Sequence, residues 1–195
     1  MKTIQTKKSI HLRVGILLMI TVALAFTRLF SLSCATPLSN FTPIGAMALF
    51  GGSYFTQKWK AFLVPLLSLW ISDMVISSLV YHHFEFFYDG FLWTYASFAL
   101  MVLIGTRIKK VNIKNVLIGA VAGALLHWVI TDLGVWLDGR LYPKNYEGFV
   151  ACYVAALPYL KNMLMGNIIF SGIAFGIFEW MQYKYPKLQL SSVHA

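Results

Sequence analysis

Five ionisable side chains interrupt long apolar runs of this sequence: Arg28, Asp73, His127, Asp132 and Lys161. A charged side chain at the centre of a bilayer costs about 2.5–3.5 kcal/mol on insertion scales, so each of these groups needs a partner or a functional role. The two positive and two negative charges balance, so each has a candidate counter-ion. The pattern is typical of ion pairs that hold helices together, or of a polar cavity that receives a solute. We favour the cavity, which ion pairs could also pre-organise.

Amide and phenol groups fall near the same predicted depth and could add hydrogen bonds. They extend the candidate substrate-binding set to Arg28, Asn40, Asp73, Tyr95, His127, Asp132, Lys161 and Asn162. The topology argued below puts the charges between the membrane midplane and its outer surface. In particular, it puts Lys161 about 16 Å along its helix.

A second group of chemistry-bearing residues lies at 81–90, where aromatic and histidine side chains predominate. One interpretation is an aromatic belt at the membrane interface, which Tyr and Trp favour. The other is a lid that stacks on a flat organic ligand, with a further aromatic residue from the 138–148 loop. The candidate lid residues are His82, His83, Phe86, Tyr88 and Tyr142.

Enzyme signatures are missing from the chain, which has no Gly-x-Ser-Gly, His-Glu-x-x-His or Walker A sequence. The adjacent residues His82 and His83 would not share one face of a helix. Cys34 and Cys152 have no Cys-x-x-Cys or Cys/His metal-ligand spacing. We therefore expect no enzyme and no cofactor. Energy coupling would come from a gradient, from trapping of the solute or from a partner.

The composition decides what kind of element must position these residues. Of the 195 residues, 58% are hydrophobic and 12% are charged, against about 25% charged in a soluble domain. The mean hydropathy is +0.68. This excludes a water-soluble globule and a disordered chain. The net charge of +9 is distributed between apolar runs, which indicates a lipid bilayer rather than nucleic acid as the partner.

Six apolar runs predict a single membrane domain over 1–195, an all-α bundle of six transmembrane helices at about 12–33, 38–56, 61–80, 91–106, 115–137 and 150–181. A helix needs about 20 residues to span a bilayer. The second and fourth runs are short, so they could pack inside the bundle. We expect Pro158 to kink the long sixth helix near its start.

The basic residues predict the orientation. Most lie in the N-terminal tail, in the loops after the second and fourth runs, and in the C-terminal tail, whereas the other three loops hold only Arg140 and Lys144. The positive-inside rule then places both termini in the cytoplasm. This alternation requires the second run to cross the membrane.

The N-terminus also has an alternative interpretation as a signal peptide, because a basic segment precedes an apolar run and Ser31–Cys34 hints at lipoprotein processing. Arg28 interrupts the run, so we favour a retained helix. Small residues four apart predict close helix packing: Gly119 with Gly123, Ala120 with Ala124, and Gly172 with Gly176.

Three sets of motifs resemble a family of small bacterial membrane proteins known only as candidate transport proteins. They are NFTPIGAMALFGG at 40–52, Pro65-Leu66 followed by Ile71-Ser72-Asp73, and the stretch from TDLGVW at 131–136 through LYP at 141–143 to CYVAALPY at 152–159. The resemblance extends from about Arg28 to Gly176. That family is in turn similar to the substrate-binding S components of energy-coupling-factor (ECF) vitamin transporters, and most of all to the solitary cobalamin S components.

The resemblance implies six helices that bind a vitamin at the outer face beneath closing loops. The motif positions carried over are Asn40, Pro43, Asp73, Asp132, Tyr142, Cys152, Pro158 and Asn162. Asp132 stands where an Asn would be expected. Cobalamin-binding relatives ligate cobalt with a cysteine, for which Cys152 is the candidate if the ligand is a corrinoid; otherwise it is a small packing residue. The first helix offers Ala23 and Ala25 but no Ala-x-x-x-Ala pair for docking an ECF energising module.

Together these features predict a multi-pass protein of the bacterial inner membrane that takes up a small organic micronutrient, with cobalamin or another vitamin as the first expectation. The alternative is a membrane scaffold whose ion pairs only hold helices together.

Overall fold

The computed structural model describes residues 7–31, 39–79, 82 and 84–189, except for the side chains of residues 7–9 and 28–31. This part of the chain contains seven α-helices and one 3₁₀ turn, and no strand. The elements are α1 (Lys7–Ser31), α2 (Ile44–Tyr54), α3 (Lys58–Leu79), α4 (Phe91–Thr106), α5 (Ile113–Asp138), α6 (Tyr146–Ala155), α7 (Leu157–Lys184) and η1 (Pro186–Leu188).

Four of the described helices are long and apolar enough to cross a membrane. These candidate spans are Ile10–Thr27, Lys58–Leu79, Ile113–Asp138 and Leu157–Lys184. The expectation of an all-α membrane protein is therefore confirmed at this level.

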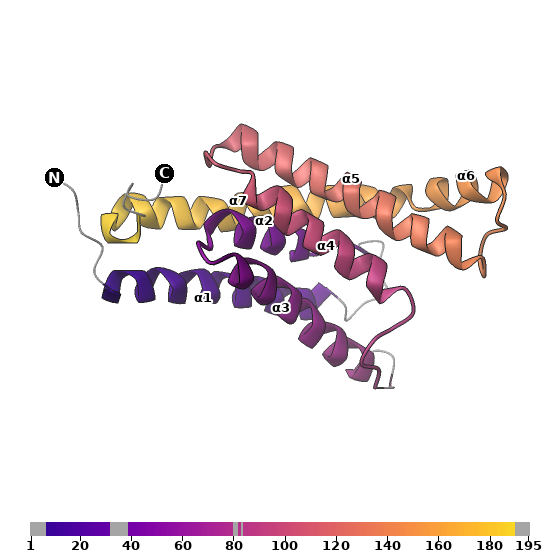
Figure 1. The fold of residues 1–195 in the computed structure, drawn as a ribbon, viewed down its shortest axis with the longest axis horizontal. Helices are drawn as coiled ribbons and strands as arrows, with labels where there is room; N and C mark the ends of the chain where they lie inside the picture. Colours follow the sequence, from indigo (N-terminus) through magenta and orange to yellow (C-terminus); the bar gives the residue numbers. More distant parts are fainter. Residues whose placement is uncertain (1–6, 32–38, 80–81, 83, 190–195) are drawn as a thin grey trace.

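The short helix α2 lies inside the bundle, where it contacts α1, α3, α4, α5 and α7 (Figure 1). Every residue of α2 except Ser53 is buried. With 11 residues it is about 16 Å long, roughly half the thickness of a bilayer's hydrocarbon core. The helix expected over 38–56 is thus much shorter. Residues 39–43 are not helical, because Asn40 has a φ of 68° and a residue before proline, here Thr42, disfavours the α conformation.

Glycines bring the backbones of α2 and α4 into contact. A Cβ atom at Gly52 would lie 2.2 Å from the carbonyl oxygen of Val102, and one at Gly105 would lie 2.4 Å from that of Leu49. On α5, the small residues Gly119, Ala120, Gly123 and Ala124 are buried, as expected for close packing. In contrast, Cβ atoms at Gly172 and Gly176 would meet nothing within 4 Å in the described chain, so this pair makes no helix contact there.

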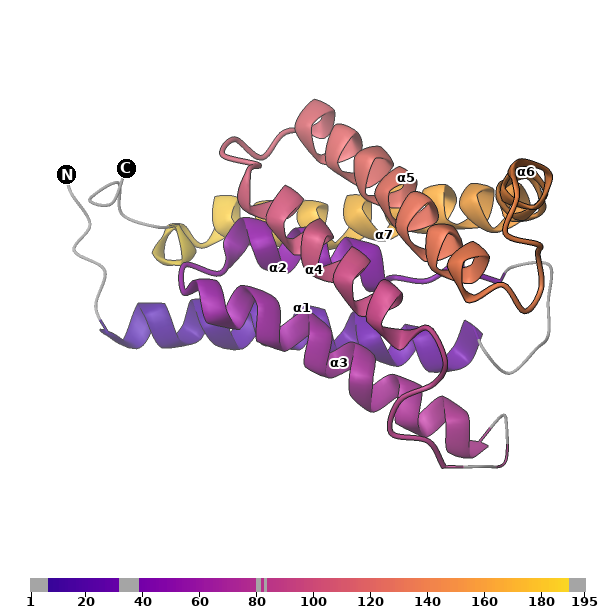
Figure 2. The ribbon, with the colours of Figure 1, turned by 45° about the vertical axis from the view of Figure 1, so that its right-hand side comes forward.

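The sixth apolar run forms two helices rather than one. α6 ends at Ala155 and α7 begins at Leu157, with Pro158 in its first turn. Proline has no N–H to donate the hydrogen bond that would continue α6, and it is tolerated in the first turn of a helix, where Pro158 lies. Figure 2 shows α6 nearly end-on beyond the start of α7. The prediction of one kinked helix over 150–181 is therefore wrong, because the chain turns away at Ala156.

Both ends of the bundle are distinguishable by their connections. The first turn of α1 and the last turn of α7 lie toward one end, together with the α2–α3 and α4–α5 connections (Figure 1). The α3–α4 and α5–α6 connections lie toward the other. The exposed basic residues Lys58, Arg107 and Lys184 belong to the end that holds α1's start.

Arg13, near the start of α1, is only 4% exposed. Its guanidinium donates to Gln182 Oε1 over 3.1 Å and also to the carbonyl oxygen of Leu188. It lies 5.1 Å from the centre of the Phe178 ring. These contacts tie α1 to α7 and η1.

Candidate functional site

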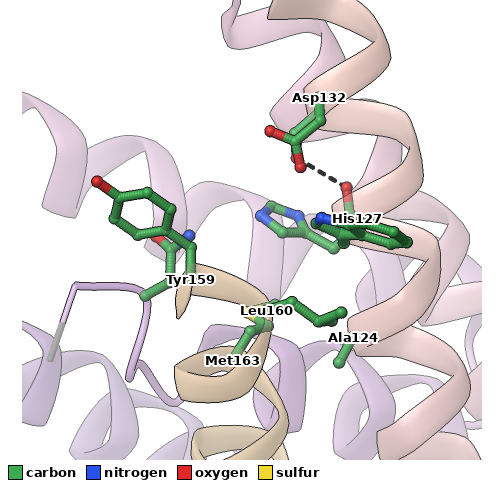
Figure 3. Close-up of a pocket in the computed structure, with 9 residues that line it drawn as sticks. Ala124, His127, Asp132, Tyr159, Leu160 and Met163 are labelled. Atoms are coloured by element: carbon green, nitrogen blue, oxygen red, sulfur yellow. Dashed lines mark hydrogen bonds between the residues drawn. The ribbon is translucent and has the colours of Figure 1, made fainter. Parts of the chain in front are cut away.

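A small pocket lies between the second half of α5 and the first turns of α7 (Figure 3). Its volume of about 60 Å³ offers room for about four water molecules. The lining residues are Asn40, Ala124, His127, Trp128, Thr131, Asp132, Tyr159, Leu160 and Met163.

Helix periodicity explains why these residues meet. Ala124, His127, Trp128 and Thr131 are three or four residues apart, so they share one face of α5. Leu160 and Met163 are three residues apart and share one face of α7. Figure 3 shows the imidazole of His127 reaching toward Tyr159, with Asp132 on one side and the apolar Leu160 and Met163 on the other.

The turn that precedes α2 contributes Asn40. Asn162 Nδ2 donates to the carbonyl oxygen of Ser39 over 2.9 Å, which fixes this turn on α7. A Cβ atom at Gly166 would lie 3.0 Å from the carbonyl oxygen of Thr42, so the missing side chain lets the irregular segment lie against the helix. Non-helical backbone is tolerated at membrane depth where it is buried in protein or lines a polar cavity.

His127 is held in one orientation. Its Nδ1 lies 2.7 Å from Ser97 Oγ on α4, and its ring centre lies 4.9 Å from that of Phe98. Ser97 Oγ itself donates to the carbonyl oxygen of Thr94 over 2.7 Å. A hydroxyl can donate or accept, so Ser97 can pair with Nδ1 in either tautomer of the neutral ring; when Nδ1–H donates to Ser97, Nε2 is an acceptor.

Asp132 is the acidic residue of the pocket. Its side chain is half-buried, and it makes no ion pair or side-chain hydrogen bond with any residue that the structure describes. Its carbonyl oxygen lies 3.5 Å from Cys152 Sγ. Removing a carboxylate from water without a partner is unfavourable, so the pocket as it stands favours a ligand or water at this carboxylate.

The indole nitrogen of Trp128 is a second group that lacks a partner. Trp128 Nε1 is buried and donates to no acceptor in the described part of the chain. Trp128 also lines the pocket, and because buried polar groups are usually hydrogen-bonded, this N–H stands out. Sequence reasoning missed Trp128, Thr131 and Tyr159, although the spacing of the first two from His127 would have placed them on the same face of α5.

Asp73 and Tyr95 lie outside this pocket. The Tyr95 hydroxyl donates to Asp73 Oδ2 over 2.9 Å, joining α4 to α3. Neither residue is part of the pocket lining. The structure thus separates the two carboxylates that the sequence placed in one candidate set.

Lys161 does not join the pocket. Because α7 begins at Leu157, Lys161 lies about 6 Å into the helix rather than about 16 Å. Its side chain is exposed and makes no ion pair within the described residues. Arg28 lies within α1, but its side chain is outside the described part, as are His83 and Cys34.

The described candidate lid residues, His82, Phe86, Tyr88 and Tyr142, do not line the pocket either. His82 and Phe86 are exposed, while Tyr88 and Tyr142 are half-buried. Arg140 joins the α3–α4 loop to the end of α5, because it bonds Asp138 and reaches Asp89 over 2.7 Å. The hydrogen bonds and negative charges of these two carboxylates raise the pKa of Arg140 above its usual value, and Asp138 has the larger effect.

Cys152 is 2% exposed and does not line the pocket. Among the described residues, no group of three or more His, Cys, Asp or Glu side chains could hold a metal ion. Cys152 is therefore best described as a small buried residue that packs against α5.

The chain matches a family of unknown function, DUF6580, over residues 8–188. The chain belongs to this family. No curated protein and no solved structure matches it. For this member of DUF6580, the pocket between α5 and α7 is therefore the starting point for a functional proposal.

Proposed function

We propose that this protein is a six-span protein of the bacterial inner membrane, with both termini in the cytoplasm. Four long apolar helices support this, and the alternation would be completed by α4 and by α2 together with the non-helical segment before it. The basic residues at one end of the bundle agree with the positive-inside rule.

Single-cysteine labelling tests this topology. In a background lacking Cys34 and Cys152, an impermeant maleimide applied to intact cells should label Lys144→Cys. It should label Lys110→Cys only after the membrane is permeabilised. The reverse pattern, or labelling of both in intact cells, contradicts the proposed orientation.

We further propose that the protein binds a small organic micronutrient at the pocket and takes part in its uptake, in the manner of an S component. The observation that carries this proposal is the Asp132 carboxylate, which lacks a described partner in a pocket lined by further polar groups. An ionisable residue at membrane depth usually marks a solute pathway. An ECF-type module remains a proposed partner, although the first helix has no docking motif for it.

The pocket volume bears on the ligand. Pockets for drug-sized ligands have about 300–1,000 Å³, whereas this one has about 60 Å³. A corrinoid would require the outer loops and α6 to open widely, and Cys152 to leave its packed position. We therefore place a smaller vitamin-like solute ahead of cobalamin.

A binding screen tests the proposal. Purified protein in detergent is heated with individual vitamins and related nutrients, since a ligand at 100 times its Kd stabilises the folded state by about 2.7 kcal/mol. The shift should disappear in Asp132→Asn and persist in Asp138→Asn, which makes the same change further along α5. If no compound shifts the transition, or both variants respond alike, the uptake proposal fails.

A membrane scaffold is the second candidate function. The contacts of Arg13 with α7 and η1, and the Asp73–Tyr95 contact, hold helices together without any ligand. In this case Asp132→Asn would change neither solute binding nor growth on a scarce nutrient, whereas Arg13 variants would lower stability.

A further inference from the structure

We infer that the pocket recognises a positively charged ligand, the ammonium end of a small primary amine. This inference rests on the proposed function and specifies the chemistry of its ligand.

The charges of the lining residues favour a cation over an anion. Asp132 is its acidic residue, and none of the nine lining residues is Lys or Arg. Lys161, one turn into α7, is exposed and not part of the lining. Among the described residues of the lining, an anionic ligand would meet the carboxylate of Asp132 without a compensating cation, whereas an ammonium would supply the counter-ion that this carboxylate lacks there.

The pocket also offers hydrogen-bond acceptors to an ammonium group. In the tautomer that donates its Nδ1–H to Ser97, the neutral His127 ring has an acceptor at Nε2. An ammonium group has three donors and no acceptor. The Asp132 carboxylate and His127 Nε2 can accept two of them, and water or the side chain of Asn40 can accept the third. A charge-assisted hydrogen bond to a carboxylate is roughly twice as strong as a neutral one.

The aromatic walls and the size of the pocket complete the argument. Trp128 and Tyr159 line it, and the rings of Trp and Tyr attract cations through their π-faces. A volume of about 60 Å³ corresponds to about four water-sized groups, which suits an ammonium with two or three carbons. A longer ligand would leave past Asn40 and Tyr159, which are both exposed.

Matched small molecules test the charge. Full-length protein in detergent at constant ionic strength is titrated at pH 7 with propylammonium chloride, 1-propanol and sodium acetate, which have the same number of non-hydrogen atoms. Propylammonium should raise the melting temperature at concentrations where the other two do not. Its apparent affinity should fall at least tenfold in Asp132→Asn and stay within twofold in Asp138→Asn.

Failure of this inference is distinguishable from failure of the proposed function. If the nutrient screen yields a neutral or anionic ligand whose binding requires Asp132, the uptake proposal stands and the charge assignment is overturned. The same holds if acetate or propanol stabilises the protein as well as propylammonium does. If no solute of any charge gives a response that depends on Asp132, both proposals fall. An equal loss in Asp138→Asn would trace the amine effect to the surface and overturn the inference.

Discussion

The hydroxyl of Tyr95 on α4 donates a hydrogen bond to Asp73 on α3 across 2.9 Å. Two carboxylates that look equivalent in the sequence therefore have different surroundings. Asp73 takes part in a contact between helices, whereas Asp132 lines a pocket and has no side-chain partner in the described chain. This difference separates a structural carboxylate from the candidate binding residue.

Tyr95→Phe should destabilise the protein by about 1–2 kcal/mol, because it removes a hydrogen bond to a half-buried charged group. The free energy of unfolding, measured by SDS titration in mixed micelles, checks this. Tyr183→Phe is the matched control, since Tyr183 is 86% exposed. Equal stability of the two variants would show that the Asp73 contact contributes nothing.

Asp132→Asn should leave the free energy of unfolding unchanged or raise it, because it removes a half-buried charge that has no described counter-ion. The same titration measures this in the absence of solute. A loss above about 1 kcal/mol would instead indicate that Asp132 is paired in the folded state.

Arg13→Met should lower the free energy of unfolding by about 2–3 kcal/mol, because the guanidinium donates to Gln182 and Leu188 and bonds from a charged donor are worth about 1.5–3 kcal/mol. Arg107→Met, at an exposed position, is the control and should change stability by less than about 0.5 kcal/mol. Similar losses in both variants would argue against a specific role for Arg13.

Gly52→Ala should be strongly destabilising, since its Cβ atom would lie 2.2 Å from the carbonyl oxygen of Val102 and would push α2 away from α4. Gly172→Ala, where the added atom meets nothing within 4 Å, should be neutral or should stabilise the helix by up to about 1 kcal/mol. The yield of folded, monodisperse protein and its melting temperature distinguish the two outcomes. A tolerated Gly52→Ala would contradict the close contact between these helices.

The sequence by itself determined the helical membrane character and most of the helix positions. Apolar composition and run length depend on the local chain alone, so the residues expected for the fourth helix, 91–106, are those of α4, and those of α3 and α5 agree within three residues. The same local signals identified His127 and Asp132 as polar groups that need a partner or a role, and Asn40 as a group that could add hydrogen bonds.

Only the tertiary structure decided which of these groups meet. The break at Ala156 moves Lys161 close to the helix start and leaves it exposed, and the packing of α3 on α4 gives Asp73 its contact with Tyr95. It also brings Tyr159 of α7 beside the face of α5 that carries His127 and Trp128. A sequence gives the spacing of residues along one helix, but the rotation and depth of that helix depend on how its neighbours pack. Convergence on a pocket is a property of several helices at once.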